Sequence, residues 1–149
     1  MKYETMLERF LGYVNFKSRS NAASTTLPST PEQKDFLRML KGQLEELNLS
    51  DIVLNEENWF LTATLPANTD KPYDKIGFIS HVDTADFNVE GINPQVIENY
   101  DGEDIVLNKE LNIVMTKEEF PNLNNYKGLT LITTDGTTLL GADDKAGIT

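Results

Sequence analysis

Residues 76–84 read Ile76-Gly77-Phe78-Ile79-Ser80-His81-Val82-Asp83-Thr84, a short apolar run that leads directly into a histidine and an aspartate. A continuous apolar run of this length is typical of a strand that is covered on both faces of a sheet. We therefore predict a central strand over residues 76–80. In open α/β sheets, ligands bind beyond the carboxyl ends of the strands, which is where His81 and Asp83 emerge.

Two amphipathic helices are predicted before this strand. Apolar residues at three- and four-residue steps form one stripe of a first helix, at Tyr3, Met6, Leu7, Phe10, Leu11 and Val14. Residues 18–30 predict a polar loop that ends in a helix start, with Thr30 as N-cap, Pro31 at the first helical position and Gln33 placed to complete a capping box. The second helix carries one apolar face, formed by Phe36, Leu37, Leu40, Leu44 and Leu47.

Short strands are predicted on either side of the central one. A hairpin is predicted from residues 52–54 and 59–65, which flank a polar turn. Residues 86–128 are acidic and rich in Asn and Gly, and they predict a long excursion that contains a small hairpin over 105–107 and 113–115.

Residues 129–133 predict one more strand, which leads through the turn Asp135-Gly136 into a helix start at 139–147. Almost no residues follow to bury the face of that helix. Helices combined with interior-type strands indicate an α/β fold, with helices packed on a mixed central sheet. We expect residues 1–149 to be the first part of a larger α/β domain that is incomplete at its C-terminal end.

The composition is that of an ordinary globular protein with a strong acidic bias. The 149 residues contain 13 Lys and Arg against 24 Asp and Glu, which gives a formal net charge of −11 and a pI near 4.4. This charge disfavours phosphate backbones and anionic lipid, so we expect neither nucleic acid nor membrane as a partner. The absence of cysteine excludes disulfides, thiolate zinc sites and a cysteine nucleophile. With no secretory leader and no apolar run of membrane-spanning length, we expect a cytoplasmic protein.

His81 is the only histidine of the chain, and Asp83 stands two positions after it. Because side chains alternate along a strand, both point to the same face and can act as a pair. An aspartate that accepts an imidazole N–H fixes the tautomer and leaves the other ring nitrogen for a metal. The alternative is a core histidine that is capped by a neighbouring aspartate, and this short motif alone does not separate the two.

Asp143 and Asp144 follow Gly141 at the predicted helix start. The helix dipole favours acidic residues there by ~0.3–1 kcal/mol, which is a sufficient structural reason for them. The functional alternative is that one carboxylate bridges two metal ions ~3.5–4 Å apart, as in binuclear hydrolases. Both acidic motifs follow predicted interior strands, and this coincidence favours a shared site.

Three longer motifs together carry a resemblance to a known family: residues 76–88, Phe120-Pro121-Asn122-Leu123, and Thr134-Asp135-Gly136-Thr137-Thr138-Leu139-Leu140-Gly141-Ala142-Asp143-Asp144-Lys145-Ala146-Gly147. They resemble the peptidase T family, bacterial tripeptide aminopeptidases of the co-catalytic zinc peptidase clan, and the likeness covers all 149 residues. It implies that His81 is a ligand to one zinc ion, that Asp83 is the catalytic-centre aspartate that supports His81, and that Asp143 bridges both zinc ions. It also implies a cis peptide bond between Asp143 and Asp144.

The family's general base and remaining zinc ligands have no counterpart in residues 1–149. The resemblance implies that a Glu-Glu pair, a further Asp, a second His and a lid domain that binds substrate and dimerises lie outside this chain. We therefore expect residues 1–149 to be the N-terminal part of the catalytic domain of a two-zinc metallopeptidase, which releases the N-terminal residue from tripeptides. The full-length protein is expected to be active and able to form a homodimer, and this chain alone is expected to be inactive.

Two alternatives remain open from the sequence. The first is a non-catalytic acidic module in which Asp83, Asp143 and Asp144 hold Ca²⁺ or Mg²⁺ through oxygen ligands. Metal binding would then not depend on His81, whereas in a zinc site it would. The second is a related clan member that cleaves other amides, such as a dipeptidase or an aminoacylase.

Overall fold

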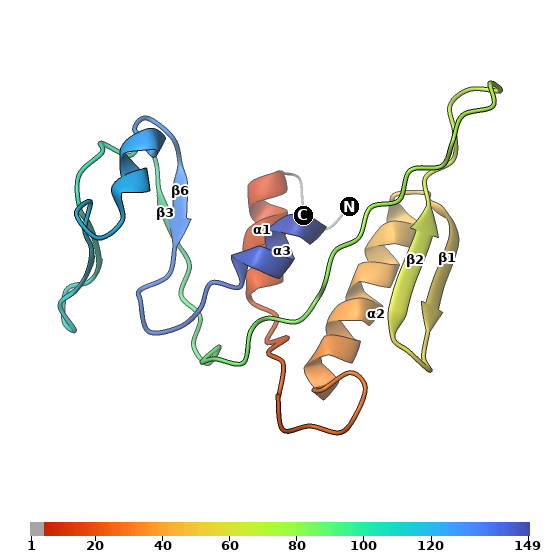
Figure 1. The fold of residues 1–149 in the computed structure, drawn as a ribbon, viewed down its shortest axis with the longest axis horizontal. Helices are drawn as coiled ribbons and strands as arrows, with labels where there is room; N and C mark the ends of the chain where they lie inside the picture. The colour runs from red at the N-terminus through yellow and green to blue at the C-terminus, as the bar shows by residue number, and fades with distance from the viewer. Residues whose placement is uncertain (1–4) are drawn as a thin grey trace. The chain divides into compact units, whose positions relative to one another are not determined.

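The computed structural model describes residues 5–149, so the predicted stripe position Tyr3 lies outside the described residues. The helices are α1 (Met6–Val14), α2 (Pro31–Glu46), the 3-10 helix η1 (Pro121–Tyr126) and α3 (Ala142–Ile148) (Figure 1). The strands are β1 (Ser50–Asn55), β2 (Phe60–Thr64), β3 (Gln95–Ile97), β4 (Ile105–Asn108), β5 (Ile113–Met115) and β6 (Leu131–Thr133). No helix within residues 5–149 has the length and apolar character that crossing a membrane requires. The chain divides into two compact units, one formed by Gly141–Thr149 with the residues up to Asp86, the other by Phe87–Leu140.

A capping box starts α1. The Thr5 hydroxyl accepts a hydrogen bond from the backbone N–H of Glu8, and the Glu8 carboxylate accepts one from the backbone N–H of Thr5. Two of the N–H groups that a helix start leaves without partners are thereby satisfied. Of the predicted apolar stripe, Phe10 and Val14 are buried as expected, whereas Met6 is exposed.

The second helix, α2, starts where the sequence predicts, with Thr30 as N-cap and Pro31 in the first turn. The predicted capping box is wrong. The Thr30 hydroxyl donates to the Arg19 carbonyl at 2.8 Å, and the Gln33 amide donates to the Thr30 hydroxyl at 3.0 Å. The Thr30 hydroxyl thus accepts from the Gln33 side chain and makes no capping hydrogen bond with a backbone N–H of the first turn. Leu47, predicted on the apolar face, lies past the last helical residue and is exposed.

The predicted hairpin is confirmed: β1 and β2 pair antiparallel, with Leu54 opposite Leu61. Figure 1 shows α2 lying alongside this hairpin. The core of the first unit is a buried cluster of Tyr13, Phe36 and Leu40, against which pack the partly buried Phe16, Met39, Leu61, Val82 and Ile148. Val82 follows His81 directly and Ile148 belongs to α3, so one core supports both parts of the candidate site.

The predicted central strand is wrong. Residues 76–80 form no strand, and Ile76, Phe78 and Ile79 are 81%, 95% and 98% exposed. A strand requires a neighbouring backbone to complete its hydrogen bonds, and none within residues 5–149 pairs with this segment. The predicted mixed central sheet is wrong for the same reason, since the described sheets are three antiparallel pairs, β1–β2, β3–β6 and β4–β5. The α/β class is confirmed, as short helices combined with small antiparallel sheets.

The second unit contains the predicted small hairpin, in which β4 and β5 pair antiparallel. β6 pairs antiparallel with β3, a three-residue strand that the sequence pattern did not predict. The core of this unit is a buried cluster of Tyr100, Ile105 and Leu123. Gly136, in the predicted turn, has a φ of 79°, and a Cβ there would lie 2.7 Å from Ile113 Cγ2. Only glycine fits this turn without displacing its neighbour.

Candidate functional site

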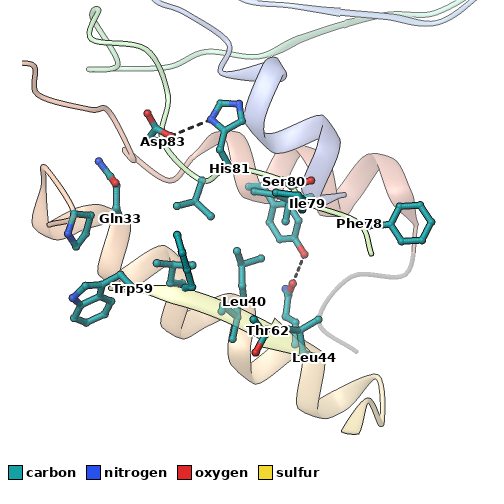
Figure 2. Close-up of a pocket in the computed structure, with 18 of the residues that line it drawn as sticks. Gln33, Leu40, Leu44, Trp59, Thr62, Phe78, Ile79, Ser80, His81 and Asp83 are labelled. Carbon is teal, nitrogen blue, oxygen red and sulfur yellow. Dashed lines mark hydrogen bonds and ion pairs between the residues drawn. The ribbon is translucent and has the colours of Figure 1, made fainter. Parts of the chain in front are cut away.

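His81 and Asp83 lie side by side in the first unit, as their spacing predicts (Figure 2). Asp83 Oδ1 is 3.1 Å from His81 Nδ1, and the two side chains are about half exposed. An isolated parallel β-bridge between Arg19 and Thr84 connects the segment that carries His81 and Asp83 to the loop after α1. In this bridge the Thr84 N–H donates to the Ser18 carbonyl at 3.0 Å, and the Ser20 N–H donates to the Thr84 carbonyl at 2.8 Å. The pairing with Asp83 at Nδ1 leaves Nε2 as the ring nitrogen that faces other groups.

Asp143, near the C-terminal end of the chain, lies next to this second ring nitrogen, His81 Nε2. It lies in the first turn of α3, after the N-cap Gly141, whose φ of 71° suits glycine. Asp143 Oδ2 is 3.8 Å from His81 Nε2, and the carboxylate is largely exposed. The structure therefore brings together the three residues that the sequence analysis singled out.

Two expectations about the local backbone are wrong. His81 does not follow a strand, because residues 76–80 have no pairing partner among the described residues. The Asp143–Asp144 peptide bond is not cis, since the cis bond in residues 5–149 is Leu27–Pro28. Both aspartates lie in a regular helical turn, which is built from trans peptide units.

Asp144, unlike Asp143, lies in the protein interior. It is fully buried, and its Oδ2 accepts a hydrogen bond from Lys145 Nζ at 2.7 Å. Burial raises the pKa of Asp144, and the hydrogen bond and charge of Lys145 oppose that rise. Asp144 therefore has a structural partner. The calcium or magnesium alternative requires Asp83, Asp143 and Asp144 together, and it loses one of its three carboxylates.

The charges around His81 favour its protonated form. Partial burial lowers the pKa of His81, but the hydrogen bond with Asp83 and the negative charges of Asp83, Asp144 and Asp143 together raise it above 6.5. Because the folded-state pKa is raised, the contribution of this pair to stability is fully present below the unfolded-state pKa of about 6.5. That contribution is lost as pH rises through the folded-state pKa.

We expect the imidazole of the metal-free chain to titrate above pH 6.5, and Asp83→Asn to lower that midpoint, because the largest favourable partner of the imidazolium is then removed. The chain has a single histidine, so one imidazole Hε1 resonance in ¹H NMR reports it directly. Asp35→Asn removes an exposed carboxylate on α2 and is the matched control. A midpoint that is the same in Asp83→Asn and in the control would contradict the described pairing.

The donor set fits a zinc ion. Zinc bonds of about 2.0–2.2 Å in tetrahedral geometry place two ligand atoms on one ion about 3.3–3.6 Å apart. The 3.8 Å between His81 Nε2 and Asp143 Oδ2 is close to this separation and longer than a hydrogen bond. Asp83 on Nδ1 is the kind of partner that metal-bound histidines use for orientation. These donors are not a complete shell, since the part of the chain from residue 5 onward holds no group of three or more His, Cys, Asp or Glu side chains able to bind a metal.

A pocket of about 780 Å³ adjoins the pair within the first unit. Leu40 and Leu44 of α2 and Leu61 of β2 contribute apolar side chains to its lining, and residues 78–83 line it on another side (Figure 2). His81 and Asp83 belong to this lining. The pocket therefore joins an apolar surface to the polar pair.

Sequence reasoning did not identify the buried residues that lie next to the candidate site. Lys145, Thr84 and Ser18 are buried and hydrogen-bonded to one another. They come from three distant segments, so no periodic pattern connects them. The one available signal was a lysine directly after two aspartates at a helix start.

The chain was compared with known proteins, and no family model matches it. It is 65% identical over 147 residues to a peptidase T from Fusobacterium nucleatum subsp. nucleatum, which covers 99% of this chain and 35% of that relative. It is 57% identical over 147 residues to a peptidase T from Enterococcus faecalis, with 98% and 36% covered, and 55% identical over 148 residues to one from Latilactobacillus sakei subsp. sakei, with 99% and 36% covered. The chain thus spans about a third of the length of the curated relatives it matches. The resemblance seen in the sequence is confirmed: over nearly its whole length this chain is similar to peptidase T, which is consistent with an N-terminal portion of such a protein.

Proposed function

We propose that the chain is the N-terminal part of the catalytic domain of a zinc-dependent tripeptide aminopeptidase. The observation that carries this proposal is the convergence of His81 and Asp143, with Asp83 on the far nitrogen of the same imidazole. The similarity to peptidase T supports it. Because the chain spans about a third of those relatives, the activity, substrates and partners of the whole protein are all part of the proposal.

Each of the three residues has its own role in this proposal. His81 would bind one zinc ion through Nε2, and Asp83 would keep Nδ1 protonated and the ring in place. The Asp143 carboxylate would be the ligand that the two zinc ions share. Zinc, when bound, would supply Lewis acidity for a peptide carbonyl and for a water molecule. The reaction is hydrolysis of the first peptide bond of a tripeptide, with the general base and the remaining ligands supplied from outside residues 1–149.

The exposed apolar run supports the proposal that residues 1–149 are part of a larger domain. Ile76, Phe78 and Ile79 are almost fully exposed, although burying a side chain of this kind stabilises a fold by about 1.5–3 kcal/mol. A contiguous exposed apolar patch marks an interaction surface, and a further segment of the same domain would cover it. We propose that a segment from outside residues 1–149 covers residues 76–80, in a cytoplasmic protein that also has a lid domain and forms a homodimer.

The proposal predicts tripeptide hydrolysis by the full-length protein that carries this chain, and none by residues 1–149 alone. The measurement is release of the N-terminal residue from a tripeptide panel in the presence of zinc or cobalt. Dipeptides and N-acyl amino acids serve as comparison substrates. Preference for either of these over tripeptides would identify another member of the clan, and robust turnover by the 149 residues alone would refute their proposed incompleteness.

A further inference from the structure

Lys145 is a buried lysine that joins three segments of the first unit. Its side chain is 1% exposed, and its ammonium lies 5.4 Å from the centre of the Phe36 ring in α2. Nζ donates to Ser18 Oγ at 2.6 Å, to Thr84 Oγ1 at 2.6 Å and to Asp144 Oδ2 at 2.7 Å. An ammonium has three protons, so these three acceptors use its full donor capacity. Lys145 is therefore engaged in holding structure and does not present a proton to a ligand.

The acceptors of Lys145 lie next to the candidate metal donors. Asp144 directly follows Asp143, and Thr84 stands three positions after His81. Ser18 Oγ and Thr84 Oγ1 are 3.4 Å apart, and the Thr84 backbone N–H is hydrogen-bonded to the Ser18 carbonyl. One buried cation thus ties the backbone around His81 to the first turn of α3.

The close approach of these two segments depends on the glycine that begins α3. A Cβ at Gly141 would lie 3.1 Å from Thr84 Oγ1 and 3.4 Å from Lys145 Nζ. A Cβ there would require the Thr84 hydroxyl to shift by a few tenths of an ångström, so glycine leaves room for the contact between Thr84 and Lys145.

We propose that Lys145 is a positioning residue for the candidate metal centre: its buried ammonium, bound to Ser18, Thr84 and Asp144, sets the distance between His81 Nε2 and Asp143 Oδ2. This inference rests on the proposed function. Residues that orient metal ligands typically change metal affinity by about 10–100-fold when they are replaced. The same range applies here, because the two donors stay present but lose their fixed separation.

The test uses Co²⁺ in the full-length protein that carries this chain. Affinity is measured by competition with a chelator, and the visible absorption of bound Co²⁺ reports ligand geometry independently of activity. Lys145→Met removes the ammonium and keeps an unbranched side chain. We expect affinity to fall by about 10–100-fold and the Co²⁺ spectrum to change. The matched control is Lys41→Met, which removes a half-exposed lysine of α2 and should leave affinity and spectrum unchanged.

Thr84→Val provides a second, milder test, because it removes one acceptor and keeps the Lys145–Asp144 ion pair. It carries the test if circular dichroism shows that Lys145→Met does not fold, and it should weaken Co²⁺ binding and alter the spectrum in the same sense. A folded variant of either kind with a lower melting temperature but wild-type affinity and spectrum would show a purely structural role and overturn the inference. His81→Ala distinguishes failure of this inference from failure of the proposed function. Co²⁺ affinity that depends on His81 but not on Lys145 or Thr84 defeats the inference alone, and affinity that does not depend on His81 defeats the proposed function as well.

Discussion

Replacing His81 with alanine in the full-length protein should lower zinc affinity and kcat/KM for tripeptides by more than about 100-fold. Loss of a residue that merely supports a ligand has an effect of about 10–100-fold, and loss of the ligand itself must exceed that. His81 is the only imidazole of the chain and supplies one of the two donors that face each other in the structure. Zinc affinity is measured by competition with a chromophoric chelator, and activity by release of the N-terminal residue.

Asp83→Asn is the graded comparison for this substitution. It retains the His81 ring and removes the carboxylate from Nδ1, so its effect should stay within the 10–100-fold range. Zinc affinity that is unchanged in His81→Ala would instead indicate a site built from oxygen ligands alone, as in the calcium or magnesium alternative.

Replacing Asp143 with asparagine should lower activity by a similar factor and reduce bound zinc from two ions to at most one per chain. The reason is that one carboxylate is proposed to hold both ions, and an amide offers only one acceptor oxygen and no charge. Zinc content is measured by atomic absorption on dialysed protein. Asp143 is largely exposed, so the substitution should have little effect on the fold itself.

The matched control for Asp143→Asn is Asp35→Asn on α2. Asp35 is also largely exposed and carries the same charge, but it pairs with Arg38 on its own helix. Its replacement should leave zinc content and turnover unchanged. Two tightly held zinc ions in Asp143→Asn would remove the bridging role.

Local patterns predicted the local structure well. The spacing of Phe36 and Leu40 predicted the buried face of α2, and the polar turn after residue 54 predicted the first hairpin, because both depend on residues close in sequence. The strand over residues 76–80 could not be settled in this way. Its apolar side chains are typical of a buried strand, but pairing depends on a neighbouring backbone that residues 5–149 do not provide.

The candidate site was likewise predictable from the sequence only in part. Strand alternation predicted that His81 and Asp83 share one face, and the structure has them in contact although the segment before them is not a strand. The approach of Asp143 was favoured because both motifs follow predicted strands, and it was implied by the resemblance, but no local rule connects residues so far apart. Lys145 escaped prediction altogether, because its burial results from the packing of Ser18 and Thr84, which only the folded chain brings together.

Anomalous diffraction at the zinc edge, from crystals of the full-length protein that carries this chain, tests the central claim most directly. The account predicts two zinc peaks about 3.5–4 Å apart. One should lie about 2.0–2.1 Å from His81 Nε2, and each should lie about 2.0–2.2 Å from an oxygen of Asp143. Zinc bound at a distance from both side chains, or His81 and Asp143 on separate surfaces of the protein, would contradict it.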